Sequence, residues 1–474
     1  MTEESKNTTT NTTMTEEGKE STSMGAPELS LARITWPILV EMLLHLLMGN
    51  LDILMLSHYS ERAVASVGIA NQLLQFFLML FGFVAAGTTI VISQDLGGGQ
   101  RQKAVQAACT AAALNTVLGL GISLALGGGA AFFLTLLGTP AGMMGEAGTY
   151  LRIVGSFLFL EAVMLTGSAV LRSYGLTREV MWISIGMNAV HVFGNALVLY
   201  GPFGLPQLGL EGIAWSTVVS RLLAMTAIVY AVMRTLRPRL KLASFFREAG
   251  PYARRLLGIG IPSTIEYMAY YVSQLIITSF IVSIGITALT TRVYADSVLG
   301  IVSLLATSIA VGTQIIVSRL VGGRRMAEAE DECRRSIRWS MGLCAAAAAG
   351  AAFAAEPMLR LFTEDPGVIR EGTRVLWLML LFQPAHSLCM IYQHVLKAAG
   401  DAAYPAKLGV LFMIGIRVPV SWLCITVLGF GIVGVYAAFI LDEWTRALLM
   451  RRRWAAGQWA GRREHEAHAA EAAT

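Results

Sequence analysis

Residues 84–98 read VAAGTTIVISQDLGG, and residues 309–323 read IAVGTQIIVSRLVGG. The two stretches carry glycine, threonine and serine at the same places, with a constant offset of 225 residues. The same offset carries Pro37 onto Pro262. A fixed offset that extends over several helices indicates an internal duplication.

Later parts of the chain continue this repeat. Val170-Leu171-Arg172 corresponds to Val395-Leu396-Lys397 at the offset of 225, and Gly209-x-x-Gly212 corresponds to Gly431-x-x-Gly434 at an offset of 222. Two parallel copies favour two lobes that rock against each other around a shared path. A duplicated scaffold without transport is the plainer alternative.

The composition points to a membrane. Of the 474 residues, 55% are apolar and 14% are charged, whereas soluble domains carry about 25% charged residues. Apolar runs long enough to span a bilayer, roughly 20 residues, occur repeatedly. The runs are continuous rather than alternating, which predicts helices and excludes a barrel. The expected fold class is an all-α membrane protein.

The apolar runs predict twelve transmembrane helices in two similar six-helix lobes. The expected helices cover residues 32–57, 63–93, 105–136, 148–171, 179–200, 209–233, 256–283, 288–318, 334–355, 372–397, 404–428 and 431–450.

Alternate loops differ in basic charge, and the basic set includes the stretch 234–255 and the segment after residue 450. By the positive-inside rule both termini are cytoplasmic. The expected organisation is a disordered cytoplasmic tail, an N-lobe, a cytoplasmic linker, a C-lobe and a cytoplasmic C-terminal tail. These cover residues 1–27, 28–233, 234–255, 256–450 and 451–474.

Several other classes lack their sequence signals. The net charge of +5 lies in short clusters between apolar runs, which indicates topology rather than nucleic-acid binding. The five cysteines are scattered without metal-ligand or disulfide spacing. No Walker-type lysine follows the glycines at 97–99, so no nucleotide site is expected. We expect no cofactor, no enzyme activity and a monomer.

The first predicted helix carries three ionisable residues, Glu41, His45 and Asp52. At 100° per residue the three lie on one narrow stripe of the helix. An ionisable side chain at a helix centre costs ~2.5–3.5 kcal/mol on insertion scales, so it usually faces the interior and has a function. The stripe therefore predicts a polar seam that faces away from lipid.

Motifs along residues 30–450 resemble those of one transporter family. They are WP at 36–37, MGNLD at 48–52, ASVG at 65–68, LRSYG at 171–175 and NALVLYGPFG at 195–204. Together, and in this order, they resemble the MATE (multidrug and toxic compound extrusion) family of cation-coupled efflux transporters. Each motif is loose alone, but the order and spacing are specific.

This resemblance implies a two-lobe, twelve-helix fold in a plasma (inner) membrane. It implies export of organic, often cationic or amphipathic, small molecules against inward flow of H⁺ or Na⁺. The only metal ion it implies is sodium, at Asp52, which matches the family's first-helix aspartate. Neutralising that carboxylate with a proton or sodium ion changes which conformation is favoured.

Asn188, His191 and Asn195 form one face of the fifth predicted helix. Asn195 matches a position where the family carries Asn or Asp near the coupling aspartate, whereas His191 stands where Asn is common. We hypothesise that Asp52, His191 and Asn195 converge as a cation-coupling site, together with Glu41 and His45. A hydrogen bond or buried histidine that serves only helix packing is the alternative for each.

The second half does not repeat this set, because Asp52 maps onto Ile277. Its secondary candidates are Glu266, the repeat mate of Glu41, and Asp296, which follows Arg292 by four residues. The acid–histidine content of the first half favours H⁺ over Na⁺.

A further expectation is an interlobe latch between Arg221 and the group Asp442, Glu443 and Arg446, with an interfacial salt-bridge cluster as the alternative.

Aromatic and methionine side chains suit an adaptable substrate cavity, although most such residues simply pack. The candidates are Met48, Phe76, Tyr270, Tyr271 and Tyr392. A flippase for lipid-linked or polysaccharide precursors shares the broad fold and is the alternative function; it would need a strongly cationic cavity. An intramembrane enzyme is the weakest reading, because no catalytic spacing stands out.

Overall fold

The computed structural model describes residues 29–57, 60–201, 207–237 and 242–457. Within these ranges the chain is almost entirely helical and contains no strand. The expected tail over 1–27 and most of the one over 451–474 lie outside the described residues.

The described part of the N-lobe forms seven helices. They are α1 (Leu31–Ser57), α2 (Glu61–Gly97), α3 (Arg101–Leu136), α4 (Met144–Ser156), α5 (Phe159–Ser173), α6 (Thr177–Tyr200) and α7 (Gly209–Leu236). The C-lobe repeats this order with additional breaks. Its elements are α8 (Leu242–Ile284), α9 (Ile286–Gly322), α10 (Met326–Phe353), α11 (Ala355–Arg360), α12 (Pro366–Ala398), α13 (Ala403–Phe412), the π-helical turn η3 (Met413–Arg417), α14 (Val418–Thr426) and α15 (Gly431–Ala455).

Nine helical segments of the described chain are long and apolar enough to cross a membrane, and the bent pair α4–α5 makes a tenth. The segment α13–α14 counts as one of the nine. α10 and α15 have sufficient length, 28 and 25 residues, but carry more polar residues. These twelve segments coincide with the twelve helices expected from the sequence.

Two details differ from the sequence expectations. The single helix expected over 148–171 is a pair, α4 and α5, with a bend of 46° between them. The linker expected over 234–255 is largely helical, because α7 continues to Leu236 and α8 begins at Leu242.

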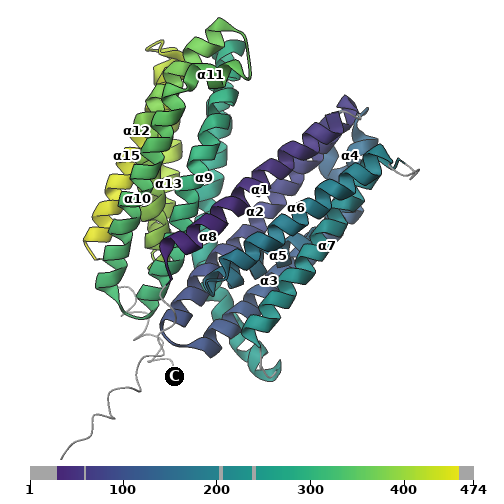
Figure 1. Cartoon of the computed structure of the whole chain (residues 1–474), viewed down its shortest axis with the longest axis vertical. Helices are drawn as coiled ribbons and strands as arrows, with labels where there is room; N and C mark the ends of the chain where they lie inside the picture. Colours follow the sequence, from purple (N-terminus) through teal and green to yellow (C-terminus); the bar gives the residue numbers. More distant parts are fainter. Residues whose placement is uncertain (1–28, 58–59, 202–206, 238–241, 458–474) are drawn as a thin grey trace, which may run out of the picture.

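The two lobes form bundles that lie together at one end and diverge toward the other, where α4 and α11 are found (Figure 1). The first helix of each lobe reaches across to the other lobe: α1 packs on α9, and α8 packs on α2. The apolar contacts repeat in the same way. Ile34 and Ile315 share one hydrophobic cluster, and Ile259 and Ile90, their mates at an offset of 225, share another.

The repeated glycines lie where the two lobes touch. A Cβ atom at Gly97 would stand 1.9 Å from the carbonyl oxygen of Arg319, and one at Gly322 would stand 2.0 Å from the carbonyl oxygen of Gln94. Because no side chain fits into such a gap, glycine allows the backbones of α2 and α9 to meet directly. This explains why the glycine pairs at 97–98 and 322–323 occur in both copies of the repeat.

We expect Gly97→Ala to lower the melting temperature of the purified protein, because its methyl group would force the α2 and α9 backbones apart. Overpacking of this kind costs about 1–3 kcal/mol. Gly121→Ala is the matched control, since no atom lies within 4 Å of a Cβ at that helical position. The control should be neutral or slightly stabilising, as alanine favours helix by about 1 kcal/mol over glycine. Equal melting temperatures for both variants would contradict the packing argument.

Candidate functional site

Asp52 of α1 lies at the centre of a polar cluster inside the N-lobe. Its Oδ1 atom is 2.9 Å from His191 Nε2 and accepts a hydrogen bond of 2.9 Å from Asn195 Nδ2. His191 and Asn195, both on α6, are fully buried, while the Asp52 side chain keeps 17% of its surface exposed. The structure thus brings together Asp52, His191 and Asn195, as expected from the sequence, and leaves the carboxylate accessible.

The spacing of α6 explains this convergence. His191 and Asn195 are four residues apart, about one helical turn, so both side chains reach the same point of α1. The Ser216 hydroxyl of α7 donates a hydrogen bond to the His191 carbonyl oxygen. Gly194, between the two polar residues, would place a Cβ 2.4 Å from Ser216 Oγ. The small residues of α6 and α7 therefore hold these helices close together and fix the position of the polar face.

A second ion pair lies near this cluster. Arg221 of α7 is 3.4 Å from Glu161 of α5, and its charge also acts on Asp52. The Arg221 pairing means that the expected interlobe latch is wrong. Arg221 finds its partner within its own lobe, because α5 and α7 pack together there.

Two buried atoms beside Asp52 have no hydrogen-bond partner among the described residues. They are His191 Nδ1 and Asn195 Oδ1. Buried polar groups are nearly always paired, so an unpaired group calls for an explanation. An incoming proton or cation would provide one, since the amide oxygen and the Asp52 carboxylate can both act as acceptors or ligands.

Glu41 and His45, the other members of the expected stripe, lie outside this cluster. Glu41 forms an ion pair with Arg172 of α5, and His45 is exposed. In the C-lobe, the repeat mate Glu266 is 2.9 Å from Lys397, which is itself the mate of Arg172. The same pairing in both lobes supports a shared structural role for the two glutamates.

Asp296 is held by neighbours in the C-lobe. Its carboxylate is 3.2 Å from Arg292 Nε and accepts a hydrogen bond of 2.7 Å from the Tyr436 hydroxyl. Arg292 also donates to Thr278 and Gln274. This arrangement is that of a neutralised pair.

The expected substrate residues separate into two groups. Met48 and Tyr392 are 9% and 7% exposed, and Tyr392 belongs to the C-lobe core, so both pack inside the protein rather than offering a surface. Phe76, Tyr270 and Tyr271 are at least 36% exposed. Tyr270 and Tyr271 lie in edge contact, with ring centroids 5.9 Å apart.

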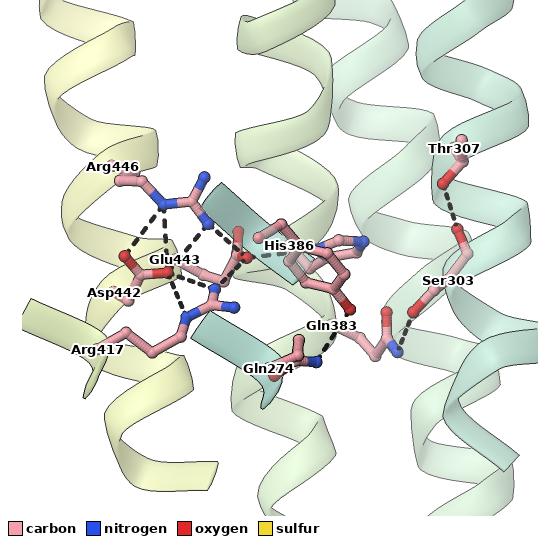
Figure 2. Close-up of polar contacts among 10 residues, drawn as sticks. Gln274, Ser303, Thr307, Gln383, His386, Arg417, Asp442, Glu443 and Arg446 are labelled. Carbon is pink, nitrogen blue, oxygen red and sulfur yellow. Dashed lines mark hydrogen bonds and ion pairs between the residues drawn. The ribbon is translucent and has the colours of Figure 1, made fainter. Parts of the chain in front are cut away.

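One residue that sequence reasoning missed is Arg417, a buried arginine of the C-lobe. Its guanidinium contacts Asp442 and Glu443 of α15, and Arg446 contacts the same two acids (Figure 2). A lone arginine in the apolar run over 404–428 is the signal that marks it. Among the described residues, no group of three or more His, Cys, Asp or Glu side chains is placed to hold a metal ion.

The family model MatE matches residues 37–197 and again residues 262–423, once in each lobe. The chain belongs to this family. It is a family of transporters, and the many apolar helices make this member a multi-pass membrane protein that moves a small-molecule substrate.

Individual relatives match over almost their whole length. The chain is 37% identical to the "uncharacterized transporter YisQ" of Bacillus subtilis, over 91% of this chain and 94% of that protein. It is 24% identical to the "probable multidrug resistance protein NorM" of Thermotoga maritima, with the same two coverages. A solved outward-facing multidrug resistance MATE transporter superposes with a TM-score of 0.82 at 18% identity, over 92% of this chain and 97% of that one.

The Glu266–Lys397 pair gives a test of its structural role. Both side chains are less than 10% exposed, so Lys397→Met would leave the Glu266 carboxylate buried without its partner. Breaking a buried pair in this way costs about 3–5 kcal/mol, so we expect a clear fall in melting temperature. The double variant Glu266→Gln with Lys397→Met should recover most of the loss, because it leaves no unpaired charge. A single variant as stable as the wild type would contradict this role.

Proposed function

We propose that this protein is a secondary exporter that couples outward movement of organic cationic or amphipathic compounds to inward movement of a monovalent cation, with Asp52 as the cation-binding group. The observation that carries this proposal is the partly exposed Asp52 carboxylate between His191 and Asn195. The two unpaired buried atoms beside it support a site that accepts a further group.

The ligand set favours H⁺ as the coupling ion. Hard metal cations take several oxygen ligands, and this part of the N-lobe offers the Asp52 carboxylate and the Asn195 amide oxygen at one point. A proton needs only the carboxylate. Its binding removes the negative charge that His191, Asn195 and Arg221 now face, so the contacts between α1 and α6 weaken. This is how proton binding would change the preferred conformation.

The arrangement of the lobes suits alternating access. They meet at the end that carries Gly97 and Gly322, and this end is flanked by basic residues such as Arg101, Arg319 and Arg324. The positive-inside rule supports a cytoplasmic orientation of this end, in agreement with the cytoplasmic termini expected from the sequence. The divergent end in Figure 1 would then face outward across the plasma (inner) membrane. Rocking of the two lobes would reverse this arrangement.

The alternative of a flippase for anionic lipid-linked precursors receives less support. Such a protein needs a cationic cavity, but the buried arginines Arg417 and Arg446 of the described C-lobe are neutralised by Asp442 and Glu443. The relatives named as multidrug resistance proteins also support export of organic compounds.

Asp52→Asn tests the proposal, because it removes the charge and keeps the shape. In proteoliposomes with an imposed pH gradient, we expect at least a tenfold loss of gradient-driven ethidium transport, with ethidium binding retained. A tenfold change corresponds to about 1.4 kcal/mol, which is within the worth of one charge-assisted hydrogen bond. Replacing the pH gradient with a sodium gradient identifies the ion.

Glu364→Gln is the matched control, since Glu364 is an exposed acid of the other lobe, between α11 and α12. It should transport as the wild type does. Full gradient-driven transport by Asp52→Asn, at equal reconstitution, would overturn the coupling role of Asp52.

A further inference from the structure

The C-lobe contains a closed group of four buried charges, Arg417, Asp442, Glu443 and Arg446, here called the charge quartet. Figure 2 shows both guanidinium groups pointing toward the two acids. Arg417 Nε is 2.9 Å from Asp442 Oδ2, and Arg417 Nη2 is 3.0 Å from Glu443 Oε1. Arg446 Nη2 is 2.7 Å from Glu443 Oε1. No side chain of the quartet is more than 4% exposed.

Arg417 occupies the C-lobe position that corresponds to His191. The two family-model matches span 161 and 162 residues, so the second copy is one residue longer and ends at an offset of 226. The π-helical turn Met413–Arg417 accommodates one additional residue in the helix equivalent to α6. At the offset of 226, His191 corresponds to Arg417, the last residue of that turn.

The neighbouring ion pair corresponds as well, but with different charges. Glu161 maps onto His386 at an offset of 225, and Arg221 maps onto Glu443 at the offset of 222 that relates α7 to α15. The first pair is 3.4 Å apart in the N-lobe, and the second is 3.7 Å apart in the C-lobe. Arg417 and Glu443 of the quartet therefore stand where the N-lobe has His191 and Arg221. The other two members, Asp442 and Arg446, correspond to uncharged residues of α7 at the offset of 222.

The two equivalent places differ in net charge. The N-lobe cluster has two acids, Asp52 and Glu161, and one arginine, Arg221, so with a neutral His191 one negative charge is left without a cation. The C-lobe quartet has two acids and two arginines, so with a neutral His386 beside Glu443 the C-lobe place carries no net charge.

Access to the two places differs in the same direction. The Asp52 side chain is 17% exposed, whereas the Asp442 side chain is fully buried. The ring of Phe439 adds a further contact, 4.7 Å from the Arg417 guanidinium carbon. Such a contact stabilises a cation that is already in place.

We propose that Arg417 is a tethered cation that permanently fills the C-lobe counterpart of the Asp52 site. Its guanidinium provides there the positive charge that a free ion provides in the N-lobe. The protein then binds one coupling cation in each transport cycle, at Asp52 only. This stoichiometry rests on the proposed function, whereas the filling of the C-lobe place by Arg417 does not.

Removing the tether should create a cation site. Arg417→Ala leaves Asp442 and Glu443 with Arg446 as their one arginine, so the group carries one net negative charge, as the N-lobe cluster does. The substitution also leaves a cavity where the guanidinium group was. We expect the purified full chain in detergent to melt at a lower temperature than the wild type. Low millimolar guanidinium chloride, far below denaturing concentrations, should recover part of the loss and bind with one additional site per chain. Sodium chloride at equal ionic strength separates a specific effect from screening.

Three further variants make this test specific. Arg417→Ala combined with Asp442→Asn restores neutrality without a cation, so it should be more stable than the single variant and insensitive to guanidinium. Arg417→Lys keeps the tethered charge and should bind no additional guanidinium. Arg360→Ala removes an arginine from the exposed pair with Glu356 and should not respond either. The test does not depend on the folding of Arg417→Ala alone. Stabilisation by guanidinium of either the double variant or Arg417→Lys would also contradict the proposal.

Failure of guanidinium to bind or stabilise a folded Arg417→Ala protein would overturn the tethered cation. The stoichiometry is tested separately, by the reversal potential of ethidium transport in wild-type proteoliposomes. One coupling cation per ethidium is expected, and two would overturn that part. If Asp52→Asn keeps coupled transport, the proposed function fails, but the guanidinium result still decides the role of Arg417.

Discussion

The constraint on which this structure depends is that every charge within the helical bundles needs a partner inside the protein. A charged side chain at the centre of a membrane helix costs free energy. Removing one partner of a buried ion pair is strongly destabilising, because the remaining charge is buried without compensation. The Glu41–Arg172 and Glu266–Lys397 pairs satisfy this constraint identically in the two lobes. Each links the first span of its lobe to the fourth, which is α4–α5 in the N-lobe and α12 in the C-lobe, so charge pairing also fixes how each bundle is assembled.

The duplication provides contacts between the lobes as well as the pairs within them. Gly97 and Gly322 let α2 and α9 touch through their backbones, and the isoleucines of α1 and α8 cover the crossing from both sides. These contacts require small or apolar residues at the same place in both copies. They leave the polar interiors free to differ, because none of the polar cluster residues takes part in the crossing.

The fold and part of the site could be predicted where a residue type, such as glycine or proline, has few structural roles. Repeated glycines and prolines predicted the two lobes, and a helical spacing of four placed His191 and Asn195 on one face toward Asp52. Long-range pairing was harder, because helical periodicity does not identify the partner helix. Arg221 was therefore assigned to the other lobe, although it pairs with Glu161. The role of Arg417 could not be predicted, because its acidic partners lie on another helix, α15. In addition, the π-helical turn shifts the repeat by one residue, so a constant offset of 225 does not align Arg417 with His191.

The two lobes show that one repeated scaffold can hold a partly exposed polar site in one copy and a fully buried one in the other. A site that exchanges an ion has to stay partly accessible and retain an uncompensated charge, as the Asp52 cluster does. A site that only has to be stable is better sealed, with its charges matched and its guanidinium groups held by two acids. The quartet meets that second requirement, at the same place in the repeat. The asymmetry between an open acid and a closed quartet would restrict ion exchange to one lobe while both lobes keep the packing that lets them move against each other.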